Sequence, residues 1–436
     1  MPPPTSPLAS TPVIAGTQTK RWPRRHVIVA LTFFASLISY TDRVNISVAA
    51  VTMKEQFGWS QTEKGFVLSS FYIGYMVFLL ASGWLATRFG GKRVLGFAVL
   101  AWSVFTLLTP FAAGVSMVVL IATRIAMGIG EAGMYPASYE MFGRWVPYNE
   151  RARAVSRLLS GIPIGTVLGL LATGWIVSRY GWPMAFYTFG AIGLLWVVAW
   201  FRQVRNDPAA DSRVTTEERA LLPAAVPQTR SIGEVPWRRL LLRVPTLAIV
   251  VAHFATTWCL YVLLSWLPSY FRDVQHLSIA NAGLFSAAPW VAMFAVTMIA
   301  GSVSDRMIEH GWSVTSTRKV MQCTGLLVSA AFLLAMRDVH SPTVALAMLC
   351  GATGALGCTW CGYAPSLIDV APRFSALLGG FSNTVATIPG IVGVAVTGWL
   401  VDVTGTYSVA FVLTAILSTA GALVFGVCFN ARPLVE

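Results

Sequence analysis

Four charged side chains lie within stretches of sequence that are otherwise apolar: Asp42, Arg43, Arg124 and Glu131. A charge inside a long apolar segment is costly, so each residue is a candidate for ligand binding or ion movement. Arginine stays protonated and its planar guanidinium matches a carboxylate, which favours an anionic ligand for Arg43 and Arg124. Asp42 and Glu131 could hold protons, because burial favours the neutral form of a carboxyl group.

A purely structural role is the alternative: Asp42 could neutralise Arg43, and Arg124 could neutralise Glu131, so that each pair only holds helices together. Helical spacing places Arg124 and Glu131 two turns apart on one face, about 10 Å along the axis. Tyr40 lies one turn from Arg43, so its hydroxyl can share that face. Other side chains that could line a cavity, or serve as packing and interfacial anchors, are Tyr75, His253, Trp258, Tyr261, Trp360, Tyr363, Ser382 and Asn383.

The composition is that of an integral membrane protein. Of 436 residues, 56% are apolar and 11% are charged, whereas soluble domains have about 25% charged residues. This composition excludes a soluble enzyme. The net charge of +13 does not indicate nucleic-acid binding, because Lys and Arg are scattered between long apolar runs. The six cysteines all lie in apolar segments and predict neither a disulfide framework nor a metal site.

Twelve apolar runs are long enough to cross a hydrocarbon layer of about 30 Å. They lie at 27–51, 64–86, 94–113, 116–140, 153–177, 182–202, 244–270, 280–303, 319–337, 342–367, 375–401 and 407–429. We therefore expect an all-α membrane protein with twelve transmembrane helices in two pseudo-symmetric six-helix bundles. The predicted parts are a disordered cytosolic tail (1–26), an amino-terminal bundle (27–202), a cytosolic linker (203–243), a carboxy-terminal bundle (244–430) and a cytosolic tail (431–436).

Short motifs recur in the two halves. GWLATR at 83–88 matches GSVSDR at 301–306, and TGWIV at 173–177 matches TGWLV at 397–401. Paired six-helix halves that bind a ligand between them are the architecture of rocking secondary transporters. Glycines and basic residues at a helix end could be only a turn and a topology signal, but the repeat favours a conformational latch. The residues assigned to this latch are Gly83, Arg88, Gly90, Asp305 and Arg306.

Charge in the loops predicts the orientation. Most of the 31 Lys and Arg residues fall in segments on one side of the predicted spans, and that side contains both termini. The positive-inside rule places it in the cytosol. The opposite face carries Lys54, Lys64, Arg179, Arg272 and Arg337.

The loop GWLATRFGGKR (83–93) resembles the signature loop between helices 2 and 3 of the major facilitator superfamily. One departure is Thr87, where that loop usually has Asp; Asp305 is present in the second half. The resemblance implies the superfamily fold, with any weakened latch on the amino-terminal side.

Within that superfamily, residues 24–430 are similar to the anion:cation symporter family, which includes bacterial sugar-acid symporters, sialin and vesicular glutamate transporters. The similarity lies in RVNISVA (43–49), RIAMGIGEAGMYPA (124–137), ERARA (150–154), WLPSYF (266–271), LIDVAPRFSALLGG (367–380) and NTVATIPGIVG (383–393). It implies that Arg43 and Arg124 contact a substrate carboxylate and that Asp42 and Glu131 are proton sites. It also places Tyr40, Tyr75 and Asn383 in the cavity.

Two segments depart from the family's patterns. Vesicular glutamate transporters have an Arg in helix 7 where this chain reads Ala-Thr-Thr-Trp at 255–258, which argues against glutamate. Sugar-acid symporters often place an amide after Ser-Gly in helix 5, whereas here Ser160-Gly161 is followed by Ile162-Pro163. The polyol-binding pattern is therefore not fully matched.

The predicted function is a proton-coupled symporter that imports a small organic anion, best matched by a sugar acid such as a hexonate, hexarate or hexuronate. An aromatic or dicarboxylic acid is the alternative substrate, a membrane sensor that binds without transport is an alternative function, and an exporter or antiporter stays open. We expect no enzyme activity, no cofactor, no bound metal and no nucleic-acid partner. We expect a monomer in the lipid bilayer, coupled to protons. The lack of a long glycosylation-bearing loop after the first span favours a bacterial inner membrane over a lysosomal or vesicular one.

Overall fold

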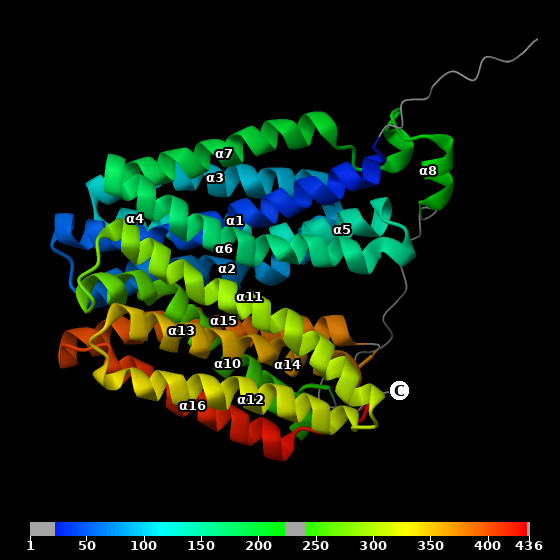
Figure 1. Ribbon diagram of the computed structural model, residues 1–436. Helices are drawn as coiled ribbons and strands as arrows, with labels where there is room; N and C mark the ends of the chain where they lie inside the picture. The colour runs from blue at the N-terminus through cyan, green and yellow to red at the C-terminus, as the bar shows by residue number, and fades with distance from the viewer. Residues whose placement is uncertain (1–21, 223–239, 373, 434–436) are drawn as a thin grey trace, which may run out of the picture.

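The computed structural model describes residues 22–222, 240–372 and 374–433, and the regular structure in these ranges is helical without strands (Figure 1). The long helices of the first half are α1 (Arg24–Phe57), α2 (Gln61–Phe89), α3 (Gly91–Val115), α4 (Met117–Glu131), α5 (Met134–Trp145), α6 (Arg151–Tyr180) and α7 (Trp182–Gln203). Those of the second half are α10 (Val244–Asp273), α11 (Ile279–Glu309), α12 (Val314–Ala335), α13 (Pro342–Leu356), α14 (Tyr363–Val370), α15 (Ser375–Thr404) and α16 (Ser408–Cys428).

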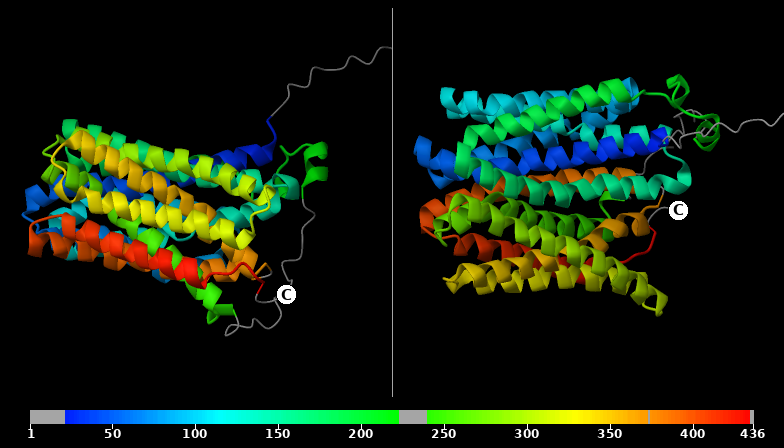
Figure 2. Two further views of the ribbon diagram at one scale, coloured as in Figure 1. Left: turned by 60° about the horizontal axis from the view of Figure 1, so that its bottom comes forward. Right: turned by 45° about the horizontal axis from the view of Figure 1, so that its top comes forward.

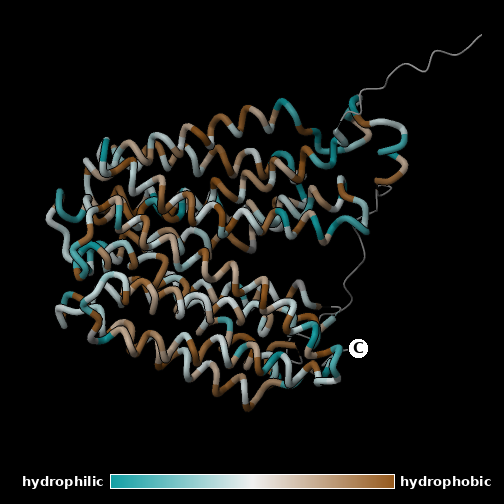
Figure 3. The backbone as a smooth tube through the Cα atoms, in the orientation of Figure 1, coloured by the Kyte–Doolittle hydropathy of each residue, from teal (hydrophilic) through white to brown (hydrophobic). Residues whose placement is uncertain are grey.

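The helices form two bundles, α1–α7 and α10–α16, which lie side by side with their long axes roughly parallel (Figures 1 and 2). Eleven helical segments of the described chain are long and apolar enough to cross a membrane. A twelfth is α2, when its parts Gln61–Leu79 and Ala81–Phe89, bent by 53°, are taken as one span. Apolar residues run along the helices and hydrophilic residues gather toward their ends (Figure 3). The expected all-α, two-bundle membrane fold is confirmed.

Local sequence explains where the helices begin and end. The first helix, α1, ends at Gly58, whose φ of 68° is in the left-handed region that glycine tolerates. The next, α2, begins with a capping box in which Ser60 and Glu63 satisfy each other's backbone N–H groups. Two predicted spans are broken. The run 116–140 divides into α4 and α5 at Ala132 and Gly133, and the run 342–367 divides into α13 and α14 around a 3₁₀ turn, Gly357–Cys361.

The chain alternates direction through the bundles, so the start of α1 and the end of α16 lie at the same end of the molecule (Figure 1). We call this end the terminal face and the opposite end the distal face. The distal face carries the turns 58–60 and 405–407. Both described ends of the chain therefore lie at one face, as the loop charges predict.

The two bundles touch each other tightly at the distal face. A Cβ on Gly174 of α6 would lie 3.2 Å from the Cα of Gly283 of α11, and one on Gly398 of α15 would lie 2.3 Å from the carbonyl oxygen of Gln61. Among the described residues, every hydrogen bond and ion pair that joins the two bundles lies at this end. The structure is thus a conformation closed at the distal face.

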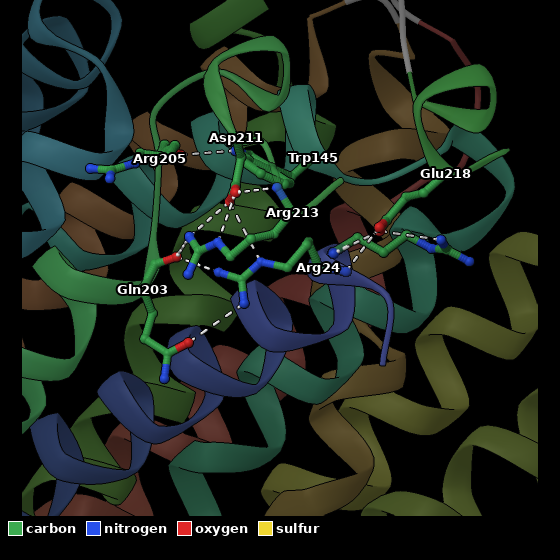
Figure 4. A network of polar contacts seen from close by, with 8 residues as sticks. Arg24, Trp145, Gln203, Arg205, Asp211, Arg213 and Glu218 are labelled. Carbon is green, nitrogen blue, oxygen red and sulfur yellow. Dashed lines mark hydrogen bonds and ion pairs between the residues drawn. The ribbon is translucent and has the colours of Figure 1, made fainter. Parts of the chain in front are cut away.

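The described part of the linker folds onto the amino-terminal bundle. It contains the short helix α8 (Thr216–Leu221), from which the Glu218 carboxylate accepts hydrogen bonds from the backbone N–H groups of Arg24 and Arg25, both 3.0 Å (Figure 4). Pro23 at the start of α1 makes no side-chain cap, so Glu218 supplies the missing acceptor at this positive helix end.

A second linker carboxylate, Asp211, lies 3.5 Å from the Arg24 Nε atom and forms an ion pair with α1 (Figure 4). Burial acts to raise its pKa, but the hydrogen bonds from Arg213 and the positive charges of Arg213 and Arg24 together hold the pKa below its usual value. The predicted tail 1–26 and linker 203–243 fall in part on residues 1–21 and 223–239, which lie outside the described residues, as do 434–436 of the second tail.

Candidate functional site

Arg43 of α1 and Glu131 at the end of α4 form a buried ion pair between the Nη2 and Oε1 atoms. Arg43 is 6% exposed and Glu131 is 1% exposed. Ser39, one turn before Arg43, donates a hydrogen bond of 2.8 Å to the same carboxylate oxygen. Because the other oxygen, Oε2, has no hydrogen-bond partner, Glu131 is incompletely satisfied and depends on Arg43 for its neutralisation.

Aromatic rings surround the Arg43 guanidinium. Its Cζ atom lies 4.7 Å from the ring centroid of Tyr40, 4.8 Å from that of Phe71 and 5.0 Å from that of Tyr75. The Tyr40 hydroxyl is 3.5 Å from Nη1, which places it on the same helical face, as its spacing predicts. Electron-rich ring faces stabilise a cation that has lost its water. The three rings therefore stabilise the buried guanidinium group and limit the directions in which it can point.

Arg124 of α4 is a second buried guanidinium, 1% exposed. Among the described residues, no carboxylate lies within ion-pair distance of it. Its Nη1 instead contacts the Met127 sulfur at 3.0 Å, and its Cζ lies 5.5 Å from the Phe71 ring centroid. Phe71 thus lies against both guanidinium groups. Of these two buried arginines, Arg43 is paired with a carboxylate and Arg124 is not.

Asp42 is fully buried, and neither of its carboxylate oxygens has a hydrogen bond of normal geometry. It interacts electrostatically with Glu131 and Arg124, and the Trp102 indole of α3 is its neighbouring donor. The ion pairs that the sequence left open, Asp42 with Arg43 and Arg124 with Glu131, are absent from the described structure. The pair that forms joins α1 to α4, which sequence spacing within one helix cannot reveal.

The carboxy-terminal bundle contributes neutral groups. Tyr261 of α10 packs on Tyr72 of α2 with ring centroids 4.6 Å apart, which joins the bundles beside the charged cluster. Asn383 of α15 is half-buried. Phe71 and Tyr72 were not among the sequence candidates, although the run Phe-Tyr-Ile-Gly-Tyr at 71–75 places aromatic side chains on the face that also carries Tyr75.

Comparison with known proteins decides the family. The family model described as "Major Facilitator Superfamily" matches residues 32–394. The chain belongs to this superfamily.

Curated relatives match nearly the whole chain. It is 34% identical over 417 residues to "Sodium-dependent phosphate transport protein 1, chloroplastic" of Arabidopsis thaliana, covering 96% of this chain and 81% of that protein. It is 33% identical over 417 residues to "Ascorbate transporter, chloroplastic" of Arabidopsis thaliana, covering 96% and 77%. The predicted membership of the anion:cation symporter family agrees with these relatives.

Solved structures share the fold at low sequence identity. A bacterial homologue of the human lysosomal transporter Spinster matches with a TM-score of 0.77 at 17% identity, covering 93% of this chain and 97% of that one. The D-xylose-proton symporter matches with a TM-score of 0.73 at 17% identity, covering 94% and 99%. The chain is a multi-pass membrane transporter of the Major Facilitator Superfamily and not an enzyme.

The predicted latch residues of this superfamily member lie near the terminal face, where the bundles are not hydrogen-bonded to each other. Arg88, Asp305 and Arg306 are exposed and form no ion pair in the described structure. Gly90 has a φ of 83° and lies against the Asn206 side chain, while a Cβ added to Gly83 would meet no atom within 4 Å. A latch between the halves therefore stays a prediction for a conformation closed at this face.

His253 of α10 illustrates the structural role of a buried polar group. Its Nδ1 atom is 2.9 Å from the Ser382 hydroxyl, and its ring stacks on Tyr363 with centroids 4.2 Å apart. Packed and hydrogen-bonded within its own bundle, it has the contacts of a structural histidine.

Proposed function

We propose that this protein is a proton-coupled symporter that imports a small organic anion, a sugar acid in our leading assignment. The observation that carries this proposal is the buried Arg124 guanidinium with no carboxylate in contact, beside the Arg43–Glu131 pair. An anionic ligand between Arg43 and Arg124 would supply the carboxylate contact that Arg124 lacks in this structure. The relatives named as phosphate and ascorbate transporters support an anionic substrate.

The proton is assigned to Glu131 and Asp42. Protonation of Glu131 would release the Arg43 guanidinium, which could then bind the substrate carboxylate. Asp42 is buried without a hydrogen-bonded cation, a setting that suits a carboxyl group that binds and releases a proton. One proton carried with a monoanion makes the step electroneutral, whereas two protons would make it electrogenic.

The side chains that the family resemblance assigns to the cavity favour a hydroxylated substrate. The Tyr40 and Tyr75 hydroxyls and the Asn383 amide supply neutral polar groups suited to hydroxylated acids, and ascorbate, named for one relative, is a hydroxylated anion. The ring faces of Tyr40, Phe71 and Tyr75 would equally suit an aromatic acid, which keeps that alternative open.

We assign the terminal face to the cytosol from the loop charges, and we propose a monomer. The relatives that match are chloroplastic plant proteins, so the proposed bacterial inner membrane rests on the short loop after α1 alone.

Uptake into proteoliposomes under an imposed pH gradient tests the proposal. The test solutes are D-galactonate, D-glucarate, D-glucuronate, ascorbate, benzoate and inorganic phosphate, and a sodium gradient replaces the pH gradient in a parallel series. We expect accumulation of a sugar acid with the pH gradient, and Glu131→Gln should exchange labelled substrate by counterflow without accumulating it. Full accumulation by Glu131→Gln would contradict the assignment of the proton to Glu131. Substrate binding without counterflow in the unmodified protein would favour a membrane sensor that binds without transport.

A further inference from the structure

Lys64, at the start of α2, differs from the other basic residues of the distal face. Lys64 is 1% exposed, whereas Arg179 and Arg337 are exposed and Lys54 and Arg272 are partly exposed. A lysine at the end of a membrane helix normally extends its ammonium group into water. Burial of this one requires an explanation.

The neighbours of Lys64 belong to the other bundle. Its Nζ atom donates a hydrogen bond of 2.9 Å to the Ser269 hydroxyl and lies 4.7 Å from the Trp266 ring centroid, both on α10. No carboxylate of the described chain is within ion-pair distance; Asp273 and Asp402 act on it from farther away. An ammonium held by one hydroxyl and one ring has lost most of its hydration, which makes the closed state costly.

Hydrogen bonds between the bundles hold the start of α2, on the distal side of Lys64. The Asp402 carboxylate of α15 accepts hydrogen bonds from the backbone N–H groups of Gln61, at 2.9 Å, and Thr62, at 2.6 Å. The Gln61 amide donates to Asp273 of α10 at 3.0 Å. A carboxylate at the positive end of a helix is favourable, so Asp402 holds the start of α2 against the second bundle while Lys64 lies beneath it.

The repeat between the halves supplies an internal comparison. The motif TGWLV before Asp402 of α15 matches the motif TGWIV before Ser178 of α6. The bundles meet along two seams: α2 with α10 and α15, and α6 with α11. There the close approach of Gly174 and Gly283 provides the contact, and the Ser178 hydroxyl bonds back to its own helix at Trp175. Among the described residues, the Asp402 contacts and the buried lysine therefore belong to the contact of α2 with α10 and α15, whereas α6 and α11 meet through glycines.

We propose that Lys64 is an anion-binding residue of the distal mouth, exposed while the bundles are apart at this face and buried when they close. This inference rests on the proposed alternating-access transport, because separation of α2 from α10 is what exposes the ammonium group. When exposed at the distal entrance between the bundles, the Lys64 ammonium group raises the local concentration of the anionic substrate. It also gives the substrate's carboxylate or phosphate group a first binding contact. Closure then transfers the ammonium group to Ser269 and Trp266.

Acetylation of lysines by the membrane-impermeant reagent sulfo-N-hydroxysuccinimide acetate, followed by peptide mass spectrometry of the full-length protein, tests exposure. Asp402→Asn should open the seal and raise the acetylation rate of Lys64 about tenfold, a shift set by the open population. Asp402→Ser, which introduces the residue of the matched seam, is the second variant, and Ser178→Ala is the control that should change nothing. Lys54, on the same face, is the internal reference.

Anion protection tests binding. D-galactonate, and inorganic phosphate in a second series, should slow acetylation of Lys64 in Asp402→Asn and leave Lys54 unchanged. In uptake assays, Lys64→Gln should raise the KM about tenfold and weaken its dependence on ionic strength, with kcat less affected, whereas Lys54→Gln should match the unmodified protein. An unreactive Lys64 in both Asp402 variants, or reactivity that neither anion alters, overturns the inference. Protection of Lys64 from acetylation by an anion, without any uptake of that anion, would instead contradict the symporter proposal and support the anion site at Lys64.

Discussion

The spanning helices of the amino-terminal bundle bury Asp42, Arg43, Lys64, Arg124 and Glu131, whereas the described part of the carboxy-terminal bundle buries no Asp, Glu, Lys or Arg. The polar groups buried in the second bundle are hydroxyls, amides and one histidine. Its ion pair, Arg318 with Asp369 at 2.9 Å, lies partly exposed near the terminal face. The two halves of the repeated fold therefore divide the buried charges unequally. The amino-terminal bundle carries the buried charges, and the carboxy-terminal bundle contributes neutral side chains that pack against it.

Removing Arg124 should produce the largest effect. Arg124→Gln deletes a buried guanidinium, and a lost charge-assisted contact of this kind costs about 2–5 kcal/mol, or at least about 30-fold in affinity. Arg318→Gln in the second bundle is the matched control and should bind normally. Titration of the transported acid into purified protein measures both, with thermal unfolding to confirm that each folds. Equal losses in the two variants would break the proposed division.

Phe71 should have the next largest effect, because its ring lies near both Arg43 and Arg124. Phe71→Leu keeps an apolar side chain but removes the ring face, and we expect affinity to fall about tenfold, within the about 0.5–2 kcal/mol range of such contacts. Phe71→Tyr retains the ring and should stay close to the unmodified protein. If Phe71→Leu binds the substrate as well as Phe71→Tyr does, the Phe71 ring has no role in holding Arg43 and Arg124.

His253 tests whether the second bundle takes part in proton coupling. His253→Gln can keep a hydrogen bond to Ser382, so we expect less than about a threefold change in uptake, the range of a single neutral hydrogen bond. The pH profile of uptake should keep its shape in this variant and flatten in Glu131→Gln. A flattened profile in His253→Gln would place a proton site in the carboxy-terminal bundle.

The smallest effect is expected where the linker joins the amino-terminal bundle. Glu218→Gln weakens the acceptor that caps α1, and loss of a helix cap costs about 0.5–2 kcal/mol. Thermal unfolding should occur a few degrees lower, with substrate affinity unchanged. Glu217→Gln, an exposed neighbour on the same short helix, is the control. An unchanged transition in Glu218→Gln would show that the linker does not stabilise this bundle.

Several features of the site followed from sequence and others did not. Burial of Asp42, Arg43, Arg124 and Glu131 was predictable, because a charge in the middle of a long apolar run has no route to water. Which arginine pairs with Glu131 was not, because the partner comes from a helix about 90 residues away, and helical spacing orders side chains only within one helix. Phe71 was missed because its spacing places it on the face of Tyr75 but does not show which side chains of other helices that face meets.

The sequence by itself determined that long apolar helices span a membrane, that they form two paired halves, and that the described ends of the chain lie on one face. These features depend on composition and on the charges of loops, which act locally along the chain. Tertiary structure alone decided that Arg43 pairs with Glu131, that Arg124 lacks a carboxylate in contact and that Lys64 is buried against Ser269. Such contacts join helices distant in sequence, and their energies depend on distance, burial and competing partners, none of which a local pattern encodes.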